Sequence, residues 1–146
     1  MNSAQQQQDA YGDQDRQDPR EAAYLAALNL QQTLQKIVEY EPNTEFLDLQ
    51  NQNIESIEHN LQPYISRLVK LKELNLEDNE IRSLPKNMAP IFPSLENLNL
   101  NGNNFDDEKF QSIVTSLSTL PRLTSLYINL HEEEQVDMVM RILDRL

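Results

Sequence analysis

The chain has 146 residues, enough for one domain with a hydrophobic core, and 24 acidic against 12 basic residues give it a formal charge of −12. This acidic excess argues against nucleic acid or an anionic membrane as the main partner, because both would repel the chain. The absence of cysteine excludes disulfides, thiol chemistry and thiolate metal sites, and it favours a reducing compartment.

The N-terminal residues 1–17 are rich in glutamine and aspartate and contain few apolar side chains. Such a segment buries too little surface to offset its ordering entropy, so we expect a disordered tail. It has no apolar core and does not predict a signal peptide. No apolar run approaches the roughly 18 residues of a membrane span. We expect a cytoplasmic protein, with a nuclear, ciliary or cytoskeletal location as alternatives.

Residues 18–41 predict a helix. Asp18 is suited to the N-cap, Pro19 to the first helical position, and Pro42 disfavours helical geometry at the residue before it. Helical spacing predicts one apolar stripe along this helix, formed by Leu30, Leu34, Ile37 and Val38. We interpret the helix as a cap over the N-terminal end of the structure that follows; a partner-binding helix is the alternative.

Residues 42–146 contain four units of one pattern, in which apolar residues occupy positions 1, 4, 6 and 11 and asparagine occupies position 9; the first unit has Thr44 at position 1 and Gln52 at position 9, and the fourth has His131 at position 9. The clearest units are 71–81 and 95–105, and the weaker units begin at residues 44 and 123. Their first residues lie 27, 24 and 28 positions apart, within the range of about 20–29 that is typical of leucine-rich repeats.

Leucines at positions 4 and 6 of each unit predict one face of a short strand. Between the units, segment 57–68 and segment 106–120 have helical apolar spacing, whereas three prolines make a long helix unlikely in segment 82–94. The expected fold is α/β: a curved repeat solenoid of about four repeats, with parallel strands on the concave side and helices and turns on the convex side. Asn79 and Asn103 are assigned to structure, because a buried turn needs its backbone groups bridged.

Positions 3, 5 and 7 alternate with the buried leucines and are therefore expected on the concave face. They comprise three acids, two aromatics, six amides and one serine, with no lysine or arginine. Phe46 and Tyr127 are candidate apolar anchors at opposite ends of this face. We predict partner binding by Phe46, Asp48, Gln50, Glu73, Asn75, Glu77, Asn97, Asn99, Asn101, Ser125, Tyr127 and Asn129. The alternative is docking on an edge or on the convex side.

Catalytic and metal-binding patterns are weak. His59 and His131 have no serine, cysteine or aspartate at a spacing typical of a nucleophilic site. The acidic runs 106–108 and 132–134 lack the alternating ligands and central glycine of a calcium loop, and each is suited to a helix N-terminus. The sequence predicts no enzyme activity, no cofactor and no metal.

The C-terminal segment 132–146 predicts another helix, with apolar residues at Val136, Val139, Met140, Leu143 and Leu146. Either this helix caps the stack, or the chain is a fragment of a longer protein. We favour the second interpretation, because a stack that ends on its return helix leaves the last strand with an unpaired edge.

Units 71–81 and 95–105 resemble the intracellular leucine-rich-repeat family, in particular the group of the phosphatase 1 regulatory subunit, dynein light chain 1, the spliceosomal A′ protein and the acidic nuclear phosphoproteins. The resemblance implies a right-handed solenoid without a cofactor, acting as an adaptor or regulatory subunit. We therefore expect a non-catalytic protein–protein interaction scaffold whose partner has a basic or polar surface, acting as a monomer or within a hetero-complex. The alternatives are a structural component of a ciliary or cytoskeletal assembly and an acidic chaperone for basic proteins such as histones.

Overall fold

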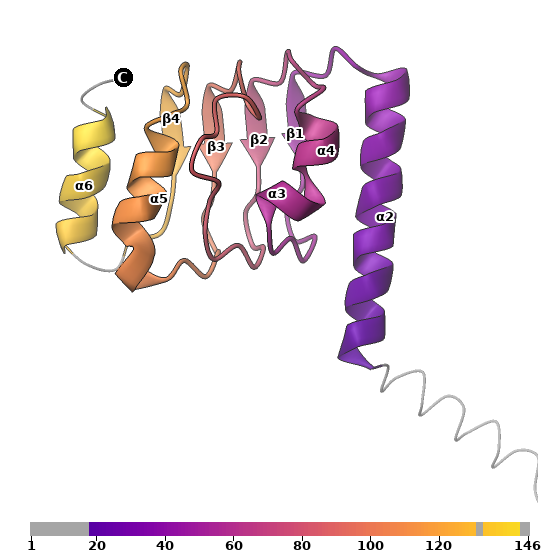
Figure 1. Cartoon of the computed structure of the whole chain (residues 1–146), viewed down its shortest axis with the longest axis horizontal. Helices are drawn as coiled ribbons and strands as arrows, with labels where there is room; N and C mark the ends of the chain where they lie inside the picture. Colours follow the sequence, from indigo (N-terminus) through magenta and orange to yellow (C-terminus); the bar gives the residue numbers. More distant parts are fainter. Residues whose placement is uncertain (1–17, 131–132, 144–146) are drawn as a thin grey trace, which may run out of the picture.

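The computed structural model describes residues 18–130 and 133–143, so the predicted tail and His131 lie outside the described residues. Its centre is a four-stranded parallel sheet in the order β1-β2-β3-β4 (Figure 1). Each strand has three residues: β1 is Phe46–Asp48, β2 is Glu73–Asn75, β3 is Asn97–Asn99 and β4 is Ser125–Tyr127. The prediction of one short strand per unit is confirmed, in chain order.

The sheet register follows the alignment of the units position by position. Leucines at position 4 lie side by side across all four strands: Leu47, Leu74, Leu98 and Leu126. The first three are buried, and Leu126 is half-buried in the last strand. These leucines point away from the open face of the sheet and join the core that lies between the sheet and the return segments.

Helix α2 (Pro19–Tyr40) stands beside the first repeat and contacts α3 and α4 (Figure 1). The Asp18 carboxylate accepts a hydrogen bond from the Arg20 backbone N–H at 2.9 Å, and the bonds from Arg20 hold the pKa of Asp18 below its ordinary value. The C-terminal half of α2 buries Leu30 and Leu34 in the core, whereas the N-terminal half projects beyond the sheet.

The first return segment is broken into two short helices, α3 (Ile57–Asn60) and α4 (Gln62–Ile65), instead of one helical run. Pro63 explains the break, because its nitrogen has no hydrogen to donate to the preceding turn and its ring would clash with it. Of the side chains predicted to point inward, Ile57, Leu61, Ile65 and Leu68 are nevertheless buried, and Tyr64 is half-buried against the core.

The second and third returns differ as the sequence predicts. Residues 82–94 form turns without a helix, and the Met88 backbone N–H donates to Thr119 Oγ1 at 2.8 Å, which ties this return to the next one. The third return consists of the 3-10 helix η1 (Asp107–Lys109) followed by α5 (Phe110–Leu117). The acids therefore stand at a helix start, as expected, and Asp106 caps it through the Glu108 N–H at 3.0 Å.

Asn79 and Asn103 bridge the turns of neighbouring units, as predicted. Asn79 Oδ1 accepts from the backbone N–H groups of Gln52 and Ile54, each at 3.0 Å. Its Nδ2 donates to the carbonyl oxygens of Leu49 and Leu76, also at 3.0 Å. Asn103 repeats the arrangement one unit later, with its Oδ1 accepting from Ile81 N–H at 3.0 Å.

A left-handed residue precedes each of these turns. Asn51, Asp78 and Gly102 share position 8 and have φ values of 56°, 56° and 73°. The turns are stacked closely, since a Cβ on Gly102 would lie 2.1 Å from Asp78 Oδ1. Glycine, asparagine and aspartate are the residues that adopt this conformation most readily, so the residue types at position 8 fit its backbone.

The C-terminal helix α6 (Glu133–Leu143) packs on α5 with an orientation that the apolar spacing did not predict. Val139 is buried, but Val136 and Met140 are 41% and 51% exposed. Gln135 is buried instead, and its Nε2 donates to Asp107 Oδ1 at 2.8 Å. No helix within the described ranges is long and apolar enough to cross a membrane.

Candidate functional site

The open face of the sheet carries positions 3, 5 and 7 of every unit. Helices α3, α4 and α5 lie on the other face (Figure 1). All twelve predicted residues are exposed or half-buried, and the register places those at positions 3 and 5 in rows that cross the strands. The row at position 3 contains Phe46, Glu73, Asn97 and Ser125, and the row at position 5 contains Asp48, Asn75, Asn99 and Tyr127.

Three side chains in the position 5 row have a structural role that the sequence analysis missed. The Oδ1 atoms of Asp48, Asn75 and Asn99 accept from the backbone N–H two residues later, at 3.1, 3.0 and 3.0 Å. Asparagine and aspartate form such local turns readily, so their recurrence at position 5 is the signal that could have revealed this role. These residues set the path of the chain as it leaves each strand.

Side chains also bond to one another across the strands. Asn75 Nδ2 donates to Asp48 Oδ1 at 3.2 Å, and Asn97 Nδ2 donates to Glu73 Oε1 at 3.0 Å. Asn129 Oδ1 accepts from the Gly102 backbone N–H. These contacts hold the polar surface in place before any partner arrives.

A shallow hollow of about 220 Å³ crosses this face. Residues 73–75 of β2 and 97–99 of β3 line its middle. Phe46 of β1 and Tyr127 of β4 lie at its two ends, and each is 58% exposed. The structure therefore brings both predicted anchors to one hollow, and among the described residues that line it Glu73 is the one with a charge.

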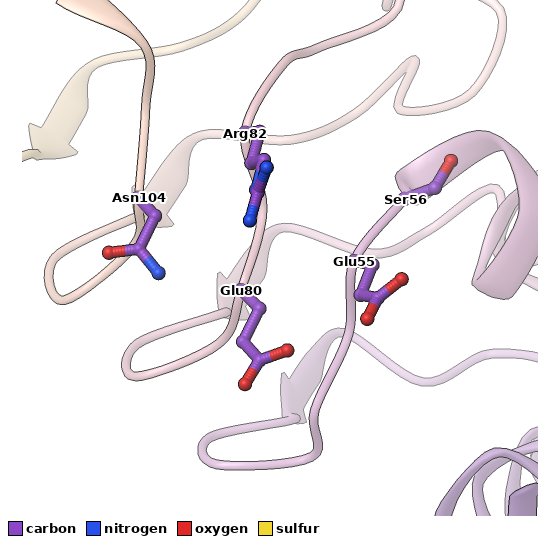
Figure 2. A pocket seen from close by; sticks show the side chains of 5 residues that line it. All are labelled: Glu55, Ser56, Glu80, Arg82 and Asn104. Carbon is purple, nitrogen blue, oxygen red and sulfur yellow. The ribbon is translucent and has the colours of Figure 1, made fainter. Parts of the chain in front are cut away.

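A second hollow, of about 580 Å³, lies where the chain leaves the turns of the first three units (Figure 2). Figure 2 shows Glu55, Glu80 and Asn104 on three neighbouring segments, with Arg82 on the segment of Glu80. Among the described residues Arg82 forms no ion pair. In the described part of the chain, every buried side-chain polar atom has a hydrogen-bond partner.

A third hollow, of about 530 Å³, runs between α2 and α4 and is lined by Gln35, Val38, Glu39, Pro63, Tyr64 and Arg67. The sequence analysis singled out neither this groove nor the hollow at Glu80. Both depend on how the return segments pack, which the repeat pattern does not specify.

The candidate catalytic and metal residues are scattered. His59 is exposed on α3, and its backbone N–H donates to the Ser56 side chain at 3.2 Å. In the ranges that the structure describes, no group of three or more histidine or acidic side chains is arranged to hold a metal ion. The open face of the sheet is the surface that brings both predicted aromatic anchors together with predicted polar residues.

Comparison with known proteins identifies the fold. The sequence matches no protein-family model and no curated protein. Among solved structures, the tropomodulin C-terminal domain from Caenorhabditis elegans is similar, with a TM-score of 0.50, 12% identity, and coverage of 80% of this chain and 92% of that one. Actin-Binding Site 2 of Leiomodin-1 is similar too, with a TM-score of 0.50, 14% identity, and coverage of 77% and 86%.

The chain has the fold of these two domains. At 12% and 14% identity the likeness concerns the fold alone. It supports the expected α/β architecture with a parallel sheet. It does not reach the phosphatase-regulator, dynein-light-chain and nuclear-phosphoprotein group that the sequence resembles, so that finer resemblance stays a prediction.

Proposed function

We propose that the chain is a right-handed leucine-rich-repeat solenoid of about four repeats, with α2 as its N-terminal cap. The support is the equivalence of the four units, each of which contributes one strand and one return segment in the same register. In this arrangement residues 18–41 form the cap and residues 42–146 the repeats. The open face of the sheet is then the concave face.

The solenoid acts as a non-catalytic protein-interaction scaffold or regulatory adaptor, and the partner binds on the concave face. The observation that carries this proposal is the hollow between Phe46 and Tyr127. Two large aromatic side chains that stay exposed beside a fixed polar network are typical of an interface, where aromatic anchors contribute much of the binding energy.

In this proposal the affinity for the partner depends on a concave surface whose side chains are already ordered before the partner binds. The turns are bridged by the buried Asn79 and the half-buried Asn103, and concave side chains bond to one another across the strands. Little conformational entropy is then lost when a partner docks, so a modest contact area suffices. The twelve concave residues include three acids and no lysine or arginine, which favours a partner with a basic or polar surface.

The test is a triple substitution of Glu73→Gln, Glu77→Gln and Tyr127→Ala. We expect partner binding to weaken at least tenfold, because an aromatic anchor and two charges are removed from an interface. The partner is first isolated by affinity purification and mass spectrometry, and its affinity is then measured for both proteins.

The matched control is Glu55→Gln, Glu80→Gln and Tyr40→Ala, which makes the same chemical changes at exposed positions outside the concave face. Circular dichroism checks that both triple variants are folded. Equal affinities of the concave variant and the unchanged chain for the partner would contradict the proposal.

A second candidate function is a structural role in a cytoskeletal assembly. The observation that favours it is the fold shared with Actin-Binding Site 2 of Leiomodin-1, a site that binds actin in that protein. Actin is therefore the first partner to test. Co-sedimentation with actin filaments, or a change in the rate of filament growth, would support this candidate, and the absence of both effects would remove actin from it.

A further inference from the structure

The hollow on the open face contains acceptors that the protein itself leaves unused. Glu73 Oε1 is engaged by Asn97 Nδ2 at 3.0 Å. Among the described residues, the other carboxylate oxygen of Glu73 and the amide oxygen of Asn97 accept no hydrogen bond. Both residues line the hollow. A carboxylate and an amide oxygen are thus held next to each other at the surface, and among the described residues Glu73 forms no ion pair.

Phe46 completes this end of the hollow. The register places it directly opposite Glu73 on the neighbouring strand, and its ring is 58% exposed. A cation that approaches the Glu73 carboxylate would also lie against the face of an aromatic ring, which attracts positive charge. A planar guanidinium stacks on such a ring and donates several hydrogen bonds at once, whereas an ammonium group is compact and strongly hydrated.

The geometry points to an arginine of an extended partner segment as the occupant of this end of the hollow. This inference rests on the proposed function and names the chemistry of the partner that the open face binds. The guanidinium lies on Phe46 and donates to Glu73 and to the Asn97 amide oxygen. The single negative charge in the hollow is thereby neutralised.

Tyr127, at the far end of the hollow, offers a second contact, and its distance from Phe46 sets the spacing between two side chains of the partner segment. Phe46 is on β1 and Tyr127 is on β4, three strand spacings away, and Tyr127 also lies two residues further along the strand direction, so the two are about 16 Å apart. An extended chain advances about 3.3 Å per residue, so about five residues cover this distance. Tyr127 then receives an apolar side chain about five positions from the arginine. Within the described chain the Asn99 Nδ2 group donates no hydrogen bond and is available to a backbone carbonyl between the two.

The experiment selects peptides from a random twelve-residue library displayed on phage, with the whole chain as the target. We expect enrichment of sequences with an arginine and an apolar residue about five positions away. The best peptide is then synthesised with arginine, lysine or glutamine at that position, and binding is measured by fluorescence anisotropy. The lysine form is expected to bind several-fold more weakly, and the glutamine form at least tenfold more weakly.

Two variants of the chain test whether the arginine of the peptide binds at Glu73 and Phe46. Glu73→Gln keeps an acceptor for Asn97 but removes the charge, and Phe46→Leu keeps apolar bulk but removes the ring. Each is expected to weaken the arginine peptide about tenfold and to reduce its preference over the glutamine form. Glu80→Gln is the matched control, because it removes one exposed charge outside this hollow and is expected to leave the affinity unchanged.

Several results would overturn the inference: a selection that enriches no arginine, equal binding of the arginine and glutamine peptides, or an equal loss of affinity with Glu80→Gln. Failure here is distinguishable from failure of the proposed function. If the triple concave variant loses the purified partner but arginine peptides show no preference, only the arginine inference falls. If the triple variant retains the partner, the proposed function falls.

Discussion

Replacing Asn79 with alanine lowers the free energy of unfolding by about 3–5 kcal/mol, since each buried polar group left without a partner costs about 1–3 kcal/mol. Asn79 is 3% exposed, and its amide satisfies two backbone N–H groups and two carbonyls from different turns. Alanine cannot replace any of these bonds. The loss is a large share of the total stability, which is about 5–15 kcal/mol for a typical domain.

Urea unfolding followed by circular dichroism measures this effect, and an unchanged slope would show that the two proteins unfold from comparable states. Asn104→Ala is the matched control, because Asn104 is exposed and its backbone N–H bond to the Ile81 carbonyl, at 3.1 Å, does not involve its side chain. The control is expected to change stability by less than about 0.5 kcal/mol. Similar losses in the two variants would show that Asn79 does not bridge the turns.

Leu34→Ala is expected to cost about 2–5 kcal/mol, because it leaves a cavity between α2 and the core. Leu34 has no exposed surface and lies in the hydrophobic cluster together with Leu30 of the same helix. Helix α2 contacts α3 and α4, so truncating this side chain weakens the contact between α2 and the first return segment.

Leu25→Ala provides the comparison within the same helix. Leu25 is 43% exposed on the half of α2 that projects beyond the sheet, and its replacement is expected to cost less than about 1 kcal/mol. The measurement is the urea midpoint for both variants. If Leu34→Ala left the unfolding of the repeats unchanged, α2 would not be part of the cooperative unit, and its assignment as a cap would be wrong.

The parts of the fold that follow from local periodicity were predictable. Alternating leucines such as Leu74 and Leu76 define the buried face of each strand, and their repetition defines the register. Asn79 could be assigned to structure because a polar residue at a fixed position beside buried leucines must satisfy backbone groups there. Pro42 likewise located the end of α2.

The parts that depend on packing between segments were not predictable from spacing. Pro63 divides the first return into two short helices, although the apolar positions on both sides fit one helix. Val136 and Met140 have helical spacing, yet contact with α5 turns Val139 inward and leaves them exposed. An apolar pattern gives the period of a helix, but it does not show which face of the helix packs against the neighbouring element.

The candidate site likewise has features that followed from the sequence pattern and features that did not. The alternation rule correctly placed all twelve residues on the accessible face, Phe46 and Tyr127 among them. It could not distinguish side chains that hold the turns, such as Asn75 and Asn99, from side chains with unused groups. That distinction rests on individual hydrogen bonds, and it limits the surface available to a partner to fewer residues than the sequence suggested.

Hydroxyl-radical footprinting of the chain, alone and in the complex isolated with its partner, tests the central claim most directly. Exposed aromatic rings report their own accessibility: Phe46 and Tyr127 are each 58% exposed on the open face, and Tyr24 and Tyr40 are 67% and 74% exposed on α2. We predict that the partner protects Phe46 and Tyr127 and leaves Tyr24 and Tyr40 as reactive as before. Protection of the α2 tyrosines with unchanged reactivity at Phe46 and Tyr127 would contradict binding on the concave face.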